Sequence, residues 1–156
     1  MNSKKILLDT NLLLLLVVGS VRIDLIQHHR RLSGFFASDF RRLADILSVA
    51  EKVVVTPNIL TETSNLLGSP KSPSDTHLFQ KLSEIVRNAE VLEEIYIPST
   101  EIAQMPQFPY LGLTDSGILS LKERNVVVLT RDMRLASECW SIGLDVLPFE
   151  LAGAQA

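Results

Sequence analysis

KKILLDTNLLLLLVV, residues 4–18, decides the fold of this chain. Its first apolar run stops at Asp9, and a second one begins at Leu12. A short apolar run that is bounded by polar residues is typical of a buried strand, and a longer one is typical of a helix. We therefore expect a strand over 4–9 and a helix that starts near residue 11 or 12. Asp9 then lies at the carboxyl end of the strand.

The same alternation of strand and helix continues along the chain. Further strands are expected at 53–55, 95–97, 126–129 and 145–149. Helices are expected at 24–32, 39–51, 57–67, 75–88, 115–124 and 132–142, whereas 68–74 and 105–109 are rich in proline and are expected to be irregular. Strands and helices that alternate at this interval favour a parallel sheet covered by helices on both faces. The fold class predicted is therefore α/β, a three-layer α/β/α sandwich.

Length and composition are those of one globular domain. The 156 residues are 46% hydrophobic and 21% charged, enough to bury a sizeable core, and we assign 1–150 to a single domain and 151–156 to a tail. The single cysteine, Cys139, excludes an internal disulfide and a thiolate metal site, and favours a reducing, cytoplasmic compartment. A net charge of -3 argues against a broadly basic nucleic-acid coat, but leaves room for a local basic patch.

The start of the chain imitates a secretory signal, because two lysines precede an apolar run that ends at Gly19-Ser20. Asp9 and Asn11 interrupt that run. The uninterrupted part, 12–18, is far shorter than the ~20 residues that a membrane span needs. We therefore expect this segment to belong to the folded domain and expect no membrane partner.

Four carboxylates follow or flank the predicted strands: Asp9, Glu62, Asp115 and Asp132. If the sheet is parallel, all four converge on the edge where α/β folds build active sites. Clustered carboxylates repel one another and raise one another's pKa, so such a group usually persists because a divalent cation neutralises it. The sequence therefore indicates metal-dependent chemistry.

Each acid also has a purely structural explanation. Asp132 could be only the N-cap of its helix, which is the better explanation when that residue is taken alone. Asp115 could be a first-turn acid that favours the helix dipole, although it shares a face with apolar residues. Glu62 lies on the flank of an apolar stripe, and Asp9 interrupts a run that should be wholly buried. Asn11 and Thr130 could be a helix cap and a turn residue, or could orient the carboxylates.

Cationic candidates for contact with a phosphate are few. Arg131 adjoins Asp132 and could touch a phosphate, although an exposed arginine in a turn is the commoner case. Arg30 and Arg31 end a basic run that could follow the phosphate backbone of a nucleic acid or could simply be solvated. The two histidines before them, His28 and His29, have no spacing typical of metal ligands.

The motifs together resemble the PIN domain, a family of metal-dependent ribonucleases. The resemblance covers residues 4 to about 149 and depends on four segments: Ile6-Leu7-Leu8-Asp9-Thr10-Asn11, a helical Glu62 after Val55-Thr56-Pro57, Thr114-Asp115-Ser116-Gly117, and Leu129-Thr130-Arg131-Asp132. It implies that Asp9, Glu62 and Asp115 are the principal ligands of Mg²⁺ or Mn²⁺. Asp132 would complete the site, with Asn11 and Thr130 in support. The family often has an aromatic residue three positions after the fourth acid, where this chain has Leu135.

The resemblance implies an endoribonuclease that acts on single-stranded or structured RNA with one or two bound ions. Compact relatives are the toxins of bacterial toxin/antitoxin pairs, which form homodimers and are inhibited by a small antitoxin protein, so these partners are expected by analogy. One alternative is a PIN-like RNA-binding or protein-interaction module without catalysis. Another is a phosphatase of the haloacid dehalogenase type, but that family needs a second acid where Asn11 stands.

Overall fold

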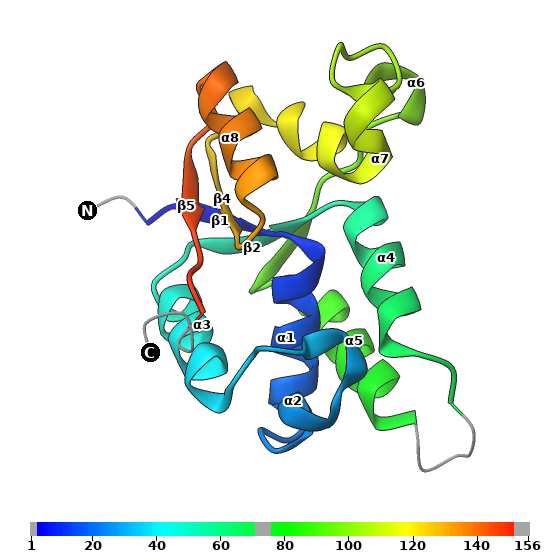
Figure 1. Cartoon of the computed structure of the whole chain (residues 1–156), viewed down its shortest axis with the longest axis vertical. Coiled ribbons are helices and arrows are strands. Elements are labelled where there is room, and N and C mark those ends of the chain that lie inside the picture. The colour runs from blue at the N-terminus through cyan, green and yellow to red at the C-terminus, as the bar shows by residue number, and fades with distance from the viewer. Residues whose placement is uncertain (1–2, 71–75, 152–156) are drawn as a thin grey trace.

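The computed structural model describes residues 3–70 and 76–151 and shows a five-stranded sheet at the centre of the molecule (Figure 1). The strands are β1 (Lys5–Leu8), β2 (Lys52–Val55), β3 (Leu92–Glu94), β4 (Val126–Thr130) and β5 (Val146–Pro148). They pair in the order β3-β2-β1-β4-β5, and every pairing is parallel. Since β1 has a neighbour on each side, Leu7 lies opposite Val54 and Val128 and is fully buried. The α/β prediction is confirmed.

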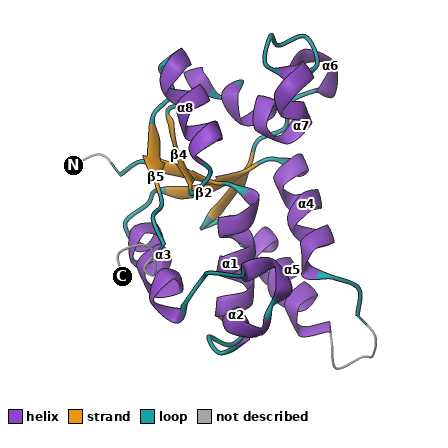
Figure 2. Cartoon of the chain, in the orientation of Figure 1, coloured by secondary structure: helices purple, strands orange, loops and turns teal. Residues whose placement is uncertain are grey.

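Helices cover both faces of the sheet (Figure 2). One side holds α1 (Thr10–Val21), α2 (Leu25–His28), η1 (Arg30–Leu32), α3 (Ala37–Ser48), α4 (Pro57–Leu67) and α5 (His77–Arg87). The other holds α6 (Ser99–Ile102), α7 (Phe108–Leu119), η3 (Lys122–Arg124) and α8 (Met133–Ile142). This arrangement is a three-layer sandwich, as the alternating sequence predicts.

The apolar run of the first helix is explained by burial on every side. α1 packs against α3, α4 and α5, and its residues from Leu12 to Leu15 are fully buried. Near its end, a Cβ on Gly19 would lie 2.2 Å from the ring of Phe40, so only glycine lets α1 and α3 approach this closely. The segment that imitates a secretory signal is therefore the central helix of the domain. No helix in the described part of the chain is both long and apolar enough to cross a membrane.

Several predicted helix ends are confirmed. Thr56 caps α4 by accepting a hydrogen bond from the Ile59 N–H at 3.2 Å, and Pro57 occupies the first turn. Gly143 closes α8 in the left-handed conformation, with φ 78° and ψ 22°.

Three expected elements differ from the structure. The strand expected at 95–97 is wrong, because β3 comes three residues earlier and contains two glutamates that hide it from an apolar pattern. The helix expected at 24–32 is divided at His29, whose ψ of 120° is extended. The segment 105–109, expected to be irregular, contains the start of α7, which ends at Leu119 rather than at residue 124. Residue 75, part of the loop 68–74 and the tail from 152 lie outside the described residues.

Candidate active site at the carboxyl edge of the sheet

Asp9 lies at the junction of β1 and α1 and is only 7% exposed. It is the N-cap of α1: its Oδ1 accepts a hydrogen bond from the Leu12 N–H at 3.1 Å. The Thr130 hydroxyl, at the end of β4, donates to Oδ2. Burial raises the pKa of Asp9 to about 6, although both hydrogen bonds favour the charged form.

Thr130 also connects Asp9 to Asp132. Its hydroxyl oxygen accepts a hydrogen bond from the Asp132 N–H at 2.9 Å while its proton is donated to Asp9. The Asp132 carboxylate remains exposed, and its Oδ1 accepts from the N–H groups of Arg134 and Leu135, at 2.9 and 3.3 Å. Asp132 is therefore the N-cap of α8, as its structural explanation predicts, and it is also joined to the buried acid of β1.

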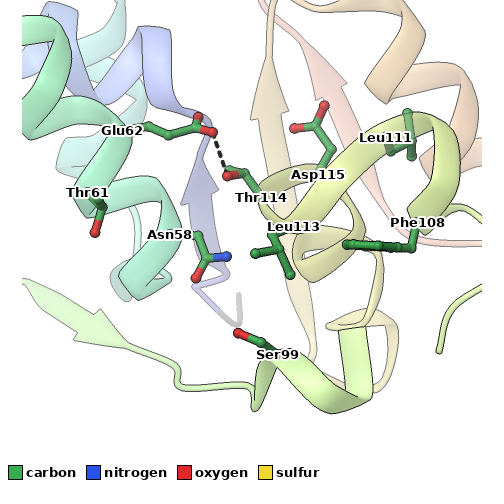
Figure 3. A pocket seen from close by; sticks show the side chains of 10 residues that line it. Asn58, Thr61, Glu62, Ser99, Phe108, Leu111, Leu113, Thr114 and Asp115 are labelled. Carbon is green, nitrogen blue, oxygen red and sulfur yellow. Dashed lines mark hydrogen bonds between the residues drawn. The ribbon is translucent and has the colours of Figure 1, made fainter. Parts of the chain in front are cut away.

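Glu62 is exposed on α4 and is held by two threonine hydroxyls. Thr114 donates to its Oε1 at 2.7 Å (Figure 3), and Thr10 donates to its Oε2 at 3.0 Å. Thr10 follows Asp9 in the sequence and Thr114 precedes Asp115. These bonds therefore join α4 to α1 and to α7 beside the other acids.

Asp115 is half-buried on α7, three residues after a break in that helix at Gly112. Among the described residues, none donates a hydrogen bond to its carboxylate. Burial raises the pKa of Asp115, and the negative charges of Asp132, Glu62 and Asp9 act in the same direction, so that the pKa reaches about 6. Arg134 acts in the opposite direction. The four predicted acids are therefore one electrostatic group.

A cavity of about 550 Å³ opens beside this group (Figure 3). We call it the α4–α7 cavity; its lining residues are Asn58, Thr61, Glu62, Ser99, Phe108, Leu111, Gly112, Leu113, Thr114 and Asp115. Two of the four acids, Glu62 and Asp115, thus line the cavity, while Asp9 and Asp132 are not among its lining residues. A ligand in the cavity would lie against the carboxylates.

The donor set suits a hard divalent cation, because it consists of carboxylate and hydroxyl oxygens. Within 3–70 and 76–151, no three histidine, cysteine, aspartate or glutamate side chains are arranged to hold one ion, so the carboxylates would have to close around it. Burial raises the pKa of the Cys139 thiol to about 12, which makes it a poor ligand. The mutual repulsion that Asp115 experiences is what a bound cation would relieve.

Asn11 does not take the place expected of it. The N-cap of α1 is Asp9, so the expectation that Asn11 caps this helix is wrong. Asn11 is exposed and, within the described residues, makes no hydrogen bond to the four acids. Thr10 and Thr114 make those contacts instead, and the sequence signal that could have found them is that each adjoins an acid.

None of the predicted cations forms an ion pair with the four acids in the described part of the chain, although the charge of Arg131 lowers the pKa of Asp9. The guanidinium of Arg131 lies 5.0 Å from the ring centre of Phe35, on the exposed side of the turn. Arg30 and Arg31 are exposed in η1, and in the described part of the chain neither forms an ion pair with the four acids. No motif had pointed to Arg134, which donates to the Tyr110 carbonyl at 3.1 Å and lowers the pKa of Asp115.

Comparison with known proteins gives no match that could assign a role to this site. No protein-family model, no curated protein and no solved structure matches this chain. What the site can do therefore follows from its own side chains.

Proposed function

We propose that this chain is a metal-dependent endoribonuclease of the PIN type, which hydrolyses RNA phosphodiester bonds. The observation that carries the proposal is the set of three threonine hydroxyls, Thr10, Thr114 and Thr130, that join the segments bearing the four acids. Helix capping alone explains Asp132 but not this convergence, because a cap needs no partner from another element. Four carboxylates from four parts of the chain are held at one edge of the sheet.

Holding these acids together is costly without a counter-charge. Asp9 is buried and Asp115 is half-buried, and the pKa of each is raised to about 6, so keeping both charged at neutral pH costs free energy. A divalent cation would remove that cost, as clustered carboxylates in proteins usually require. The proposal therefore assigns one or two Mg²⁺ or Mn²⁺ ions to Asp9, Glu62, Asp115 and Asp132.

When bound, such an ion supplies Lewis acidity and lowers the pKa of a water molecule. The chain's own residues supply orientation. Thr10, Thr114 and Thr130 fix the carboxylates, while Arg134, whose positive charge lowers the pKa of Asp115, supplies a guanidinium that can donate to a phosphate oxygen. Arg131, Arg30 and Arg31 are proposed contacts to the RNA backbone farther from the reacting bond.

The biological role is proposed by analogy with compact ribonucleases of this type. We place the chain in the cytoplasm as the toxin of a toxin/antitoxin pair, acting as a homodimer and inhibited by a small antitoxin protein. Its single-domain size and single cysteine support this role.

The test is cleavage of mixed single-stranded and hairpin RNAs with Mn²⁺ or Mg²⁺, beside an EDTA control. We expect Asp115→Asn to lower the cleavage rate at least ~100-fold, because even residues behind metal ligands are worth 10- to 100-fold. Asp145→Asn is the matched control, since Asp145 is exposed at the start of β5, at the opposite edge of the sheet. It should cleave as the wild type does.

Three outcomes would contradict the proposal. Cleavage that persists in EDTA, or that is equal in Asp115→Asn, would exclude metal-dependent hydrolysis at this site. RNA that binds but stays intact with every ion would favour a binding module. Hydrolysis of a small phosphomonoester that is lost in Asp9→Asn would favour a phosphatase.

A further inference from the structure

The α4–α7 cavity has no positively charged side chain among the described residues that line it. Its charged lining residues are Glu62 and Asp115. Apart from the cation proposed at these two acids, the described lining offers an anion no counter-charge, whereas a neutral group that carries hydrogen-bond donors needs none. The cavity volume of about 550 Å³ lies within the ~300–1,000 Å³ typical of small-molecule sites. The lining therefore suits a neutral part of a substrate better than a phosphate.

The walls of the cavity combine an aromatic ring with uncommitted polar groups (Figure 3). Phe108 and Leu113 come from α7, and Leu113 remains 40% exposed. Asn58 comes from the first turn of α4 and Ser99 from the start of α6. Neither the Asn58 amide nor the Ser99 hydroxyl forms a hydrogen bond with another described residue. A ring on which a base can stack, with free donors and acceptors for its edge, suits a nucleobase.

The arginine side chain that could bind the phosphate is not part of the cavity lining. Arg134 acts on the charge of Asp115, and its guanidinium lies 5.8 Å from the ring centre of the exposed Tyr110. Asp115 thus has the cavity on one side and a cation within electrostatic range. A nucleotide can place its base in the cavity and its phosphate between Arg134 and the cation proposed at the carboxylates.

On these grounds we infer that the α4–α7 cavity binds one unpaired nucleobase next to the bond that is cleaved. This inference rests on the proposed nuclease function. A base within a duplex must leave its stack to enter a pocket, which costs a few kcal/mol. Fully paired RNA is therefore resistant.

The test removes the nucleobase from the RNA and the phenyl ring of Phe108 from the protein, first separately and then together. The cleaved bond is first mapped in a single-stranded RNA, and abasic versions of that RNA then replace the nucleotide on each side of the bond. We expect one abasic replacement to slow the wild type about 10- to 100-fold, as loss of one stacked base would. Phe108→Ala should slow the intact RNA by a similar factor and should show no further loss on the abasic RNA.

The matched control is Phe79→Ala, which truncates a half-buried phenylalanine of α5 outside this cavity. In Phe79→Ala the abasic replacement should slow cleavage as much as it does in the wild type. Thermal unfolding checks that both variants fold. Asn58→Ala is a second cavity variant and should also reduce the penalty. Each variant, combined with the intact and the abasic RNA, forms a double-mutant cycle. Every cycle is measured a second time as RNA binding, by fluorescence anisotropy with Ca²⁺ in place of Mn²⁺.

The outcomes separate the two ideas. If Phe108→Ala keeps the full abasic penalty, or if duplex RNA is cleaved as fast as the single strand, the inference is wrong while the nuclease stands. If no RNA is cleaved with any ion, the proposed function fails, and the binding cycle alone decides whether the cavity takes a base. If the losses of binding affinity caused by Phe108→Ala and by the abasic RNA were additive, the inference would be overturned in that measurement too.

Discussion

The Thr130 hydroxyl makes two hydrogen bonds at the candidate site. It donates to Asp9 and accepts from the Asp132 N–H, so one side chain orients both acids. Thr130 is fully buried, and Asp9 is nearly so. A hydrogen bond to a buried carboxylate is among the stronger ones in proteins, because the charge has little access to water.

We expect Thr130→Val to lower the free energy of unfolding at pH 7.5 by about 1–3 kcal/mol, because a buried charge loses its donor while the volume stays the same. Urea unfolding measures this. Thr63→Val is the matched control: Thr63 is also fully buried, but its hydroxyl donates to the neutral Ile59 carbonyl at 2.8 Å. The control should lose about 1 kcal/mol or less. Equal losses in the two variants would mean that the Asp9 charge does not depend on Thr130.

At this scale the sequence predicts the acids better than their partners. An acid that interrupts or ends a buried strand is visible in the sequence, as Asp9 is. The threonines are common residues, and their partners lie 52 or 121 positions away. Arg134 was missed for the same reason, since its neighbour Tyr110 is 24 positions distant.

The break in α7 positions both the cavity wall and Asp115. Gly112 has φ 78° and ψ -172°, a conformation that is essentially restricted to glycine. Phe108 precedes the break and Asp115 follows it, so the two halves of α7 present different groups to one cavity.

Gly112→Ala should lower the free energy of unfolding by about 1–3 kcal/mol, because alanine does not favour this conformation, and should also reduce RNA cleavage. Gly68→Ala is the matched control, since Gly68 has φ 93° and ψ -179° at the end of α4. A Cβ added to either glycine would meet no atom within 4 Å, so the cost in both variants is conformational. Unfolding and cleavage are measured on each. If Gly68→Ala impaired cleavage as much, the effect would be one of stability alone.

Helices and strands were predictable where the structural propensity of a segment agrees with its burial in the fold. Strands β1, β2 and β4 are continuous apolar runs because neighbours and helices cover them. The edge strand β3 is not such a run, and its Glu93 forms an ion pair with Lys5 at 2.8 Å. The prolines of 105–109 suggested an irregular segment, but proline in a first turn is compatible with a helix, and Pro109 lies in the first turn of α7.

Across the whole molecule, the clustered acids link stability to pH. The pKa values of Asp9 and Asp115 are about 6 in the folded chain, against an ordinary value of 3.8. Raised carboxyl pKa values mean that the folded state binds protons more tightly than the unfolded state. Their contribution to stability is therefore full below about pH 3.8 and is lost as the pH rises through about 6.

In EDTA, we expect Asp115→Asn to raise the free energy of unfolding at pH 7.5 by about 1 kcal/mol, after allowance for its partial exposure to solvent. At pH 4 the gain should vanish, because the wild-type carboxyl is then largely protonated. Urea unfolding at both pH values measures the difference. A loss of stability at pH 7.5, or an equal gain at the two pH values, would contradict the linkage.

The hydrogen bond from Thr130 to Asp9 spans 121 positions, and this separation sets when the site comes into existence. During synthesis, β1 and α1 leave the ribosome long before β4, and contacts between distant segments form late because their loops are costly to close. Until β4 fills its place beside β1, Asp9 has neither its buried surroundings nor the Thr130 donor. A growing chain therefore carries no assembled carboxylate centre, and a half-made copy would not expose its ribosome to the proposed nuclease activity.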